Sequence, residues 1–209
     1  MPEILVLAGV NGAGKSSVIG ARLAANDIDW FNPDEYTRGL IAHGSSPGEA
    51  NARAWEYGRE RLEEAIRTRV DFAFETTLGG RTITSLLYRA AATHHVHVLY
   101  VGLANVDLHL ERVALRVARG GHAIPEQKIR ERWQSSRANL CRLVPVLESL
   151  QVFDNSATVP AGAVVPPPVI VIDYERGKPS RPAPDDPDRL ALVPEWSKCI
   201  LESVFQVSP

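Results

Sequence analysis

A glycine-rich segment near the start of the chain constrains the fold more than any other feature of the sequence. Residues 9–16 read GVNGAGKS and directly follow the apolar run ILVLA at 4–8. Glycine adopts backbone angles closed to other residues, so successive N–H groups of such a loop can turn inward and bind phosphate oxygens. In this pattern Lys15 reaches the β and γ phosphates, and the Ser16 hydroxyl binds Mg²⁺. The segment predicts a phosphate-binding loop, or P-loop, that holds ATP.

The context of this motif separates it from an ordinary glycine-rich turn, which is the alternative interpretation. A P-loop lies between a strand and a helix, and here an apolar run precedes the motif and a helix-compatible stretch follows it. The predicted nucleotide contacts are Gly9, Asn11, Gly12, Ala13, Gly14, Lys15, Ser16 and Ser17.

Composition limits the classes of partner. The chain has 209 residues, of which 44% are hydrophobic and 23% charged, so one domain is the default expectation. A net charge of -2 provides no global field for a nucleic-acid backbone or an anionic membrane. Cys141 and Cys199 are far apart in the sequence and lack metal-ligand spacing. With no basic leader and no run of roughly 18 apolar residues, we expect a cytoplasmic protein.

Apolar runs alternate with segments of helical period along most of the chain, which is typical of a parallel sheet covered by helices. We therefore expect an α/β three-layer P-loop kinase fold with a mostly parallel sheet. The expected strands cover residues 3–8, 28–31, 72–76, 95–103, 151–154 and 169–173. The expected helices cover residues 14–25, 49–69, 81–93, 106–119, 126–150 and 194–205.

The last quarter of the chain differs in composition from the rest. Prolines recur between residues 158 and 188 and remove backbone donors. We expect a phosphotransferase core at 1–157 and a proline-rich segment at 158–209, packed on the same domain. The segment contributes an edge strand and a terminal helix whose expected docking residues are Leu192, Trp196, Ile200 and Val204.

Two acidic residues follow predicted strands at the sheet edge where open parallel sheets bind ligands. Asp34 comes after the strand at 28–31 and can accept the proton of an incoming hydroxyl; alternatively, it only complements a helix N-terminus. Glu75 ends the strand at 72–76 and can hold substrate hydroxyls or, through water, Mg²⁺; alternatively, it is a capping or surface residue. The predicted substrate-binding residues are Asp34, Glu75, Thr76, Thr77, Arg81 and Arg112.

The predicted helix at 106–119 carries an arginine stripe formed by Arg112, Arg116 and Arg119. Two glycines follow at 120–121, and such a segment can move and then neutralise charge on a transferred phosphoryl group. The alternative is a solvated basic face. Asn155, which follows a late strand, is a candidate for the adenine side of the nucleotide site.

Five motifs together resemble the zeta-toxin family of P-loop phosphotransferases. They are AGVNGAGKSS, FNPDE, FAFETTLGGR, RVALRVARGGHAIP and VFDNS, and they occur in this order between residues 1 and 156. The resemblance implies transfer of the γ-phosphoryl group of ATP to the sugar 3′-hydroxyl of UDP-N-acetylglucosamine. It also implies an antitoxin partner that obstructs the nucleotide site.

The resemblance assigns roles by position. Lys15 and Ser16 match the phosphate and Mg²⁺ contacts, and Asp34 matches the base that takes the proton of the sugar hydroxyl. Glu75, with Thr76 and Thr77 beside it, matches the acid that holds the sugar. Arg119 matches the lid arginine on the transferred phosphate, and either Arg112 or Arg116 is its partner. Two other functions remain open: a P-loop kinase for a nucleoside, another sugar or a polynucleotide end, and a non-catalytic ATP-binding regulatory module.

Overall fold

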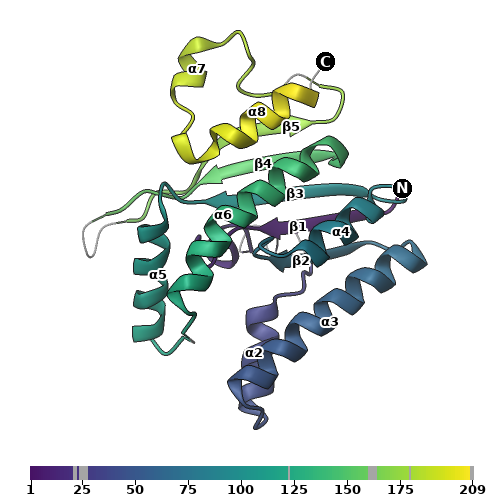
Figure 1. Ribbon diagram of the computed structural model, residues 1–209, viewed down its shortest axis with the longest axis vertical. Coiled ribbons are helices and arrows are strands. Elements are labelled where there is room, and N and C mark those ends of the chain that lie inside the picture. The colour runs from purple at the N-terminus through teal and green to yellow at the C-terminus, as the bar shows by residue number, and fades with distance from the viewer. Residues whose placement is uncertain (21–22, 24–27, 122, 160–163, 179, 208–209) are drawn as a thin grey trace.

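A five-stranded sheet forms the centre of the computed structural model (Figure 1). The structure describes residues 1–209 except 21–22, 24–27, 122, 160–163, 179 and 208–209. In spatial order the strands are β2 (Phe72–Thr76), β1 (Glu3–Ala8), β3 (His95–Gly102), β4 (Ser149–Asp154) and β5 (Val169–Glu175). The first four run parallel and β5 pairs antiparallel to β4. The predicted α/β fold with a mostly parallel sheet is confirmed.

Helices surround the sheet, and α4, α6 and α8 lie over one face of it (Figure 1). The α-helices are α2 (Pro33–Ala42), α3 (Pro47–Thr68), α4 (Arg81–Ala90), α5 (Val106–Ala118), α6 (Glu126–Leu143), α7 (Pro187–Ala191) and α8 (Lys198–Val207). Three short helical turns are η1 (Ser16–Gly20), η2 (Val144–Val146) and η3 (Glu195–Ser197).

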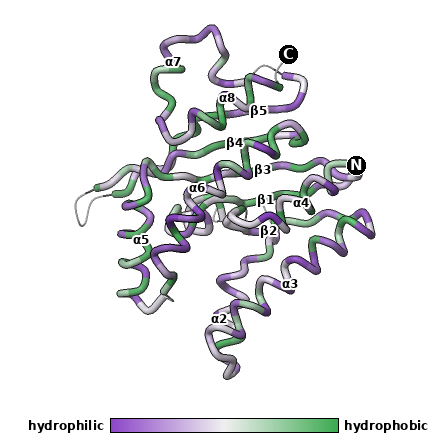
Figure 2. The backbone as a smooth tube through the Cα atoms, in the orientation of Figure 1, coloured by the Kyte–Doolittle hydropathy of each residue, from purple (hydrophilic) through white to green (hydrophobic). Residues whose placement is uncertain are grey.

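The central strands β1 and β3 bury side chains on both faces, as their apolar sequences predict. Ile4, Val6 and Tyr100 belong to a large core cluster that also includes residues of α4, α6 and α8. Leu7 and Val101, which alternate with them, pack on the opposite side with residues such as Ile19 of η1. Figure 2 shows hydrophobic colour concentrated on the strands and hydrophilic colour over much of α3.

The segment preceding α2 is not the strand that the apolar pattern predicts at 28–31. Only Phe31 pairs with the sheet, through an isolated bridge to Phe74. Asn32 then caps α2 by accepting hydrogen bonds from the N–H groups of Asp34 and Glu35. Because the cap and the following proline begin a helix, the extended run stops after one pairing residue. The sequence-based set of helices also lacks α2.

Helix boundaries differ from the prediction where proline or capping intervenes. The helix expected at 126–150 ends at Leu143, because Pro145 lacks the N–H that an α-helix needs, and β4 begins at Ser149. A capping box of Ser46 and Glu49 starts α3 two residues before the predicted position. Of the helix expected at 14–25, residues 16–20 form the turn η1, and positions 21–22 and 24–25 lie outside the described residues.

The C-terminal segment packs directly on the sheet and on α6. Trp196 of η3 is buried, and its indole N–H donates to Asp154 at the end of β4. Ile200 and Val204 of α8 are fully buried, as expected. Leu192 is wrong as a docking residue: it is 79% exposed, because it lies in the turn after α7 and not on the terminal helix.

None of the described helices is long and apolar enough to cross a membrane.

Gly102 provides a test of this packing, because a Cβ atom there would lie 2.2 Å from the Trp196 ring. We expect Gly102→Ala to lower the free energy of unfolding by about 1 to 3 kcal/mol through overpacking. Urea denaturation measures the change. Gly39→Ala is the matched control, because the space around Gly39 in α2 is open within 4 Å. Equal stability of the two variants would contradict the close approach of Trp196 to β3.

Candidate functional site

The P-loop packs closely between the end of β3 and α5. Gly9, Gly12 and Gly14 all have positive φ angles, of 141°, 83° and 89°. A Cβ atom on Gly9 would lie 2.2 Å from the carbonyl oxygen of Val101, and one on Gly12 would lie 2.8 Å from that of His109. Gly9 and Gly12 are therefore needed both for backbone angle and for space, and Gly14 is needed for backbone angle.

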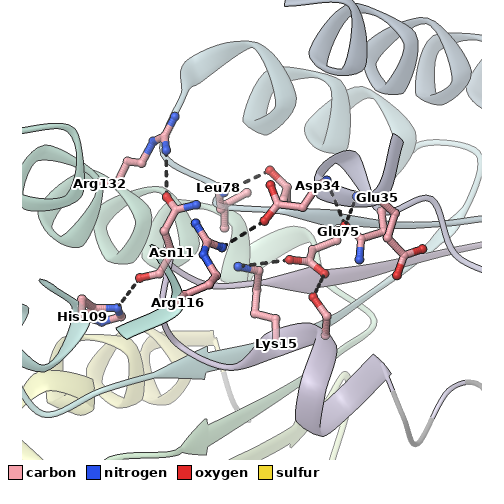
Figure 3. Close-up of polar contacts among 12 residues, drawn as sticks. Asn11, Lys15, Asp34, Glu35, Glu75, Leu78, His109, Arg116 and Arg132 are labelled. Atoms are coloured by element: carbon pink, nitrogen blue, oxygen red, sulfur yellow. Dashed lines mark hydrogen bonds and ion pairs between the residues drawn. The ribbon is translucent and has the colours of Figure 1, made fainter. Parts of the chain in front are cut away.

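The side chains of Lys15, Ser16 and Glu75 form a polar cluster at the mouth of this loop, in which Lys15 and Glu75 are buried and Ser16 is exposed (Figure 3). Lys15 Nζ lies 3.3 Å from Glu75 Oε1, and Ser16 Oγ donates to Glu75 Oε2 at 2.7 Å. The side chains of Lys15 and Glu75 are only 7% and 9% exposed. Parallel pairing causes this contact, because β2 lies beside β1 with Glu75 opposite Leu7.

Two oxygen groups of this cluster are of the kind that binds Mg²⁺ in P-loop proteins. Mg²⁺ prefers oxygen ligands, and P-loop proteins bind it with the loop hydroxyl and a carboxylate on a nearby strand. Ser16 and Glu75 are 59 residues apart in the sequence and supply these two oxygens side by side. Their arrangement favours the Mg²⁺ interpretation of Glu75 over a direct contact with the acceptor.

Asp34 lies in the first turn of α2 and faces α5 (Figure 3). Its Oδ2 atom is 3.2 Å from an Nη1 atom of Arg116, and both side chains are about one third exposed. Asn32 makes the side-chain cap of α2, and Asp34, in the first turn of the helix, also contacts Arg116 of α5. A position in the first turn is compatible with the alternative interpretation, in which Asp34 complements the helix N-terminus.

Two clefts meet at Asp34. The first has a volume of about 770 Å³ and is lined by Asp34, Glu75, Thr76 and Thr77 among others. We call it the acceptor cleft. The second, of about 790 Å³, lies between α2 and α5, and we call it the arginine cleft. Its described lining includes Asp34, Arg38, Arg112, Arg116, Arg119, Gly120 and Gly121.

The described lining of the acceptor cleft includes Thr76 and Thr77 but not the predicted residues Arg81 and Arg112. Arg81 is exposed at the start of α4 and is not part of the described lining of the cleft, although its neighbours Gly80 and Thr82 are. The Oγ1 atom of Thr76 accepts a hydrogen bond from the N–H of Leu78 and shapes the turn after β2. His122 of the lid motif lies outside the described residues.

Asn155 and Arg112 brace the P-loop from the side of β4. The Asn155 amide donates to the carbonyl of Ala13 at 2.8 Å, and Arg112 donates to the carbonyls of Asn155 and Ala157. Burial lowers the pKa of Arg112 below its ordinary value. Arg112 therefore supports the loop after β4, whereas Arg116 contacts Asp34.

Sequence reasoning missed the importance of Arg132 on α6. Its Nη1 atom donates to Oδ1 of the P-loop residue Asn11 at 2.7 Å, and it lines the acceptor cleft (Figure 3). Burial lowers the pKa of its guanidinium, and the nearby charge of Asp34 opposes that shift. The signal was present in the helical period, because Arg132 shares a face with the buried residues Ile129 and Ser136.

His109 is a second missed residue, and it holds the P-loop from α5. It is 1% exposed, and its Nδ1 atom lies 2.9 Å from the backbone oxygen of Asn11. Burial lowers the pKa of His109 from its ordinary value of 6.5 to about 4. The ring is therefore neutral near pH 7, and its Nδ1–H can donate to that carbonyl.

A comparison with protein families shows to which family the chain belongs. Residues 4–143 match the family model AAA_33, which is described as an AAA domain. The chain belongs to this AAA domain family. The match spans the P-loop, both acidic positions and the arginines of α5 and α6, and it confirms the predicted P-loop fold.

One protein is related to this chain at the level of sequence. The chain is 29% identical over 126 residues to an uncharacterized protein of Haemophilus influenzae strain Rd, a match that covers 60% of this chain and 88% of the relative. The structure of AvrRxo1-ORF1:-ORF2 with ATP is similar with a TM-score of 0.61 and 14% identity, covering 100% of this chain and 77% of that one. The PezAT chromosomal toxin–antitoxin system of Streptococcus pneumoniae contains a chain with a TM-score of 0.59 and 13% identity, covering 97% and 88%. These similarities concern the fold.

The lowered pKa of His109 predicts a pH dependence of stability. Between its folded value of about 4 and its ordinary value of 6.5, the unfolded state binds more protons than the folded state. The free energy of unfolding therefore has its full value with respect to His109 above pH 6.5 and decreases as the pH falls towards 4. We expect this loss to be on the order of 2 to 3 kcal/mol.

The control variant is His109→Asn, whose amide retains a donor near the Nδ1 position but does not titrate. Carboxylates titrate equally in both proteins, so the difference between their urea unfolding free energies at pH 4.5 and pH 7 isolates His109. Parallel pH profiles for the two proteins would show that His109 does not carry the effect.

Proposed function

We propose that the protein is an ATP- and Mg²⁺-dependent phosphotransferase that transfers the γ-phosphoryl group of ATP to a hydroxyl of a small acceptor. The observation that carries this proposal is the position of Asp34 and Glu75 on one cleft, with Glu75 also bonded to Lys15 and Ser16 of the P-loop. A nucleotide site and an acceptor site thereby adjoin. Nucleotide binding alone does not require a second carboxylate at this position.

On the donor side, we assign phosphate binding to the P-loop N–H groups and to Lys15. The Ser16 and Glu75 oxygens would hold Mg²⁺, which supplies charge neutralisation for the β and γ phosphates when bound. Lys15 now contacts Glu75 at 3.3 Å, so both side chains already face the place where phosphate and metal would meet. The protein thus provides positioning and electrostatic stabilisation.

On the acceptor side, the Asp34 carboxylate would orient the attacking hydroxyl and accept its proton. Arg116 lies 3.2 Å from Asp34, and Arg132 reaches the same region from α6. Guanidinium groups near Asp34 can neutralise charge that develops on the transferred phosphoryl group. Arg119 at the end of α5 lines the arginine cleft beside the two glycines and would act as the lid arginine.

We take a nucleotide sugar such as UDP-N-acetylglucosamine as the acceptor, on the basis of the resemblance to zeta toxins. The acceptor cleft supports a ligand with mixed chemistry, because its wall combines polar groups with the half-exposed ring of Trp55 on α3. Arg132 and Lys128 add positive charge along α6. A volume of about 770 Å³ falls within the range of small-molecule sites.

We extend the proposal to a cytoplasmic setting with an antitoxin partner that obstructs the nucleotide site. Support comes from the fold, since the chains of similar structure belong to AvrRxo1-ORF1:-ORF2 and to the PezAT toxin–antitoxin system, each with a second component.

Incubation with labelled ATP tests the acceptor directly. We expect label to accumulate on UDP-N-acetylglucosamine in a panel that also contains other sugars, nucleosides and oligonucleotides. Transfer to a different member would keep the phosphotransferase and replace its acceptor. Binding of ATP without transfer to any member of the panel or of a cell extract would favour the regulatory module.

Substitution of Asp34 tests the proposed base. We expect Asp34→Asn to reduce turnover by about 10² or more while ATP affinity changes only a few fold, because the amide cannot accept the proton. The measurements are steady-state kinetics and ATP titration by calorimetry. Glu35→Gln is the matched control, since Glu35 lies in the same turn of α2 and contacts Arg38 on the surface. Unchanged turnover in Asp34→Asn would remove Asp34 from this role.

Substitution of Glu75 tests the proposed Mg²⁺ contact. Glu75→Gln keeps the size of the side chain but removes the charge, and we expect the Mg²⁺ concentration for half-maximal activity to rise about 10- to 100-fold. A titration of activity with Mg²⁺ at saturating ATP measures this shift. If the variant lost acceptor affinity and kept the Mg²⁺ dependence of the wild type, Glu75 would be an acceptor contact instead.

A further inference from the structure

The two cysteines of the chain meet in the fold although 58 residues separate them in the sequence. Cys141 lies on α6 and Cys199 on α8, and the Sγ atom of Cys141 is 3.4 Å from the backbone oxygen of Cys199. Cys199 is exposed, Cys141 is half-buried, and both are free thiols. The sequence offered no partner for either residue, and helix packing supplies one.

The surroundings of Cys199 favour a thiolate. It is the second residue of α8, and the backbone N–H of Ile200 acts to lower its pKa. A hydrogen bond from Cys141, together with the charge of Arg137, lowers the pKa of Cys199 to about 6. The same hydrogen bond, with burial, raises the pKa of Cys141.

Arg137 is held in place by contacts of its own. Its guanidinium carbon lies 3.6 Å from the centre of the Trp133 ring, and its Nη1 atom donates to the carbonyl of Trp196 at 3.2 Å. The positive charge therefore stays near the start of α8. A fixed cation and a neighbouring thiol form the kind of environment in which cysteines are reactive.

We propose that Cys141 and Cys199 are a reversible thiol-oxidation site, at which a peroxide oxidant joins α6 to α8 through a disulfide. The exposed Cys199 thiolate attacks the peroxide O–O bond, which gives a sulfenic acid on Cys199 and releases hydroxide. The Cys141 thiol then attacks this sulfur, the S–S bond forms, and the sulfenic oxygen leaves as water. Two electrons pass from the thiols to the peroxide, and a dithiol reductant reverses the reaction.

The bond would join the C-terminal segment covalently to a helix of the candidate site. α6 carries Arg132, which contacts the P-loop, and α8 directly follows Trp196, which contacts the end of β4. The disulfide would close a loop of the chain that contains β4 and β5. It would therefore restrict the conformations of this loop in the unfolded chain. This inference does not depend on the reaction that the P-loop site performs.

Thiol counting on the full-length chain tests the proposal. The reduced protein is treated with stoichiometric hydrogen peroxide and then alkylated under denaturing conditions. We expect both free thiols to disappear, the mass to fall by two hydrogen atoms, and a peptide pair joining Cys141 to Cys199 that dithiothreitol separates. The melting temperature of the oxidised monomer should rise by roughly 5 to 10 °C.

Single substitutions separate the two roles. In Cys141→Ser, dimedone should trap a sulfenic acid on Cys199, whereas Cys199→Ser should react at least about tenfold more slowly with the same dose, since its remaining thiol is not activated. Wild-type protein that oxidised Cys199 to sulfinic acid while Cys141 stayed free would overturn the proposal. Links formed only between chains would overturn it as well. Both outcomes are read from wild-type protein and do not require a folded variant.

Discussion

The buried contact between Glu75 and Lys15 is the interaction on which the candidate site depends. A charge taken out of water is costly unless it is paired and hydrogen-bonded, and here one carboxylate accepts from Ser16 while it neutralises Lys15. Removing one partner of such a pair leaves the other charge uncompensated. The contact exists because β2 lies beside β1 and parallel to it. The order of strands in the sheet therefore decides which charged groups meet at the site.

Asp34 connects the two sides of the site. It lines both the acceptor cleft and the arginine cleft, and Arg116 holds its carboxylate towards α5. The P-loop itself is braced from three directions, by Arg132 of α6, His109 of α5 and Asn155 after β4. For the proposed phosphotransferase, support of this kind would favour catalysis by positioning, since the groups that would meet phosphate and acceptor would need little rearrangement. α5 and α6 therefore contribute side chains that hold the P-loop in place.

The C-terminal segment completes the sheet and its core. β5 adds the antiparallel edge strand, and Trp196 occupies the space that Gly102 leaves open at the end of β3. α8 then packs on α6, and this packing brings the two thiols together. The segment thus links the edge of the sheet to the helix that carries Arg132, although its proline-rich sequence shows little regular pattern.

Local patterns in the sequence determined the P-loop, the apolar strands and the amphipathic helices, because each depends on residues close along the chain. Capping and proline chemistry explain the departures: Asn32 with Pro33 starts α2 directly after the run at 28–31 where a strand was expected, and Pro145 ends α6 early. Only the tertiary structure decided that Glu75 meets Lys15, that Arg132 meets Asn11 and that Cys141 meets Cys199. These contacts join residues 58 or more positions apart, and strand order and helix packing, which no short-range period encodes, bring them together.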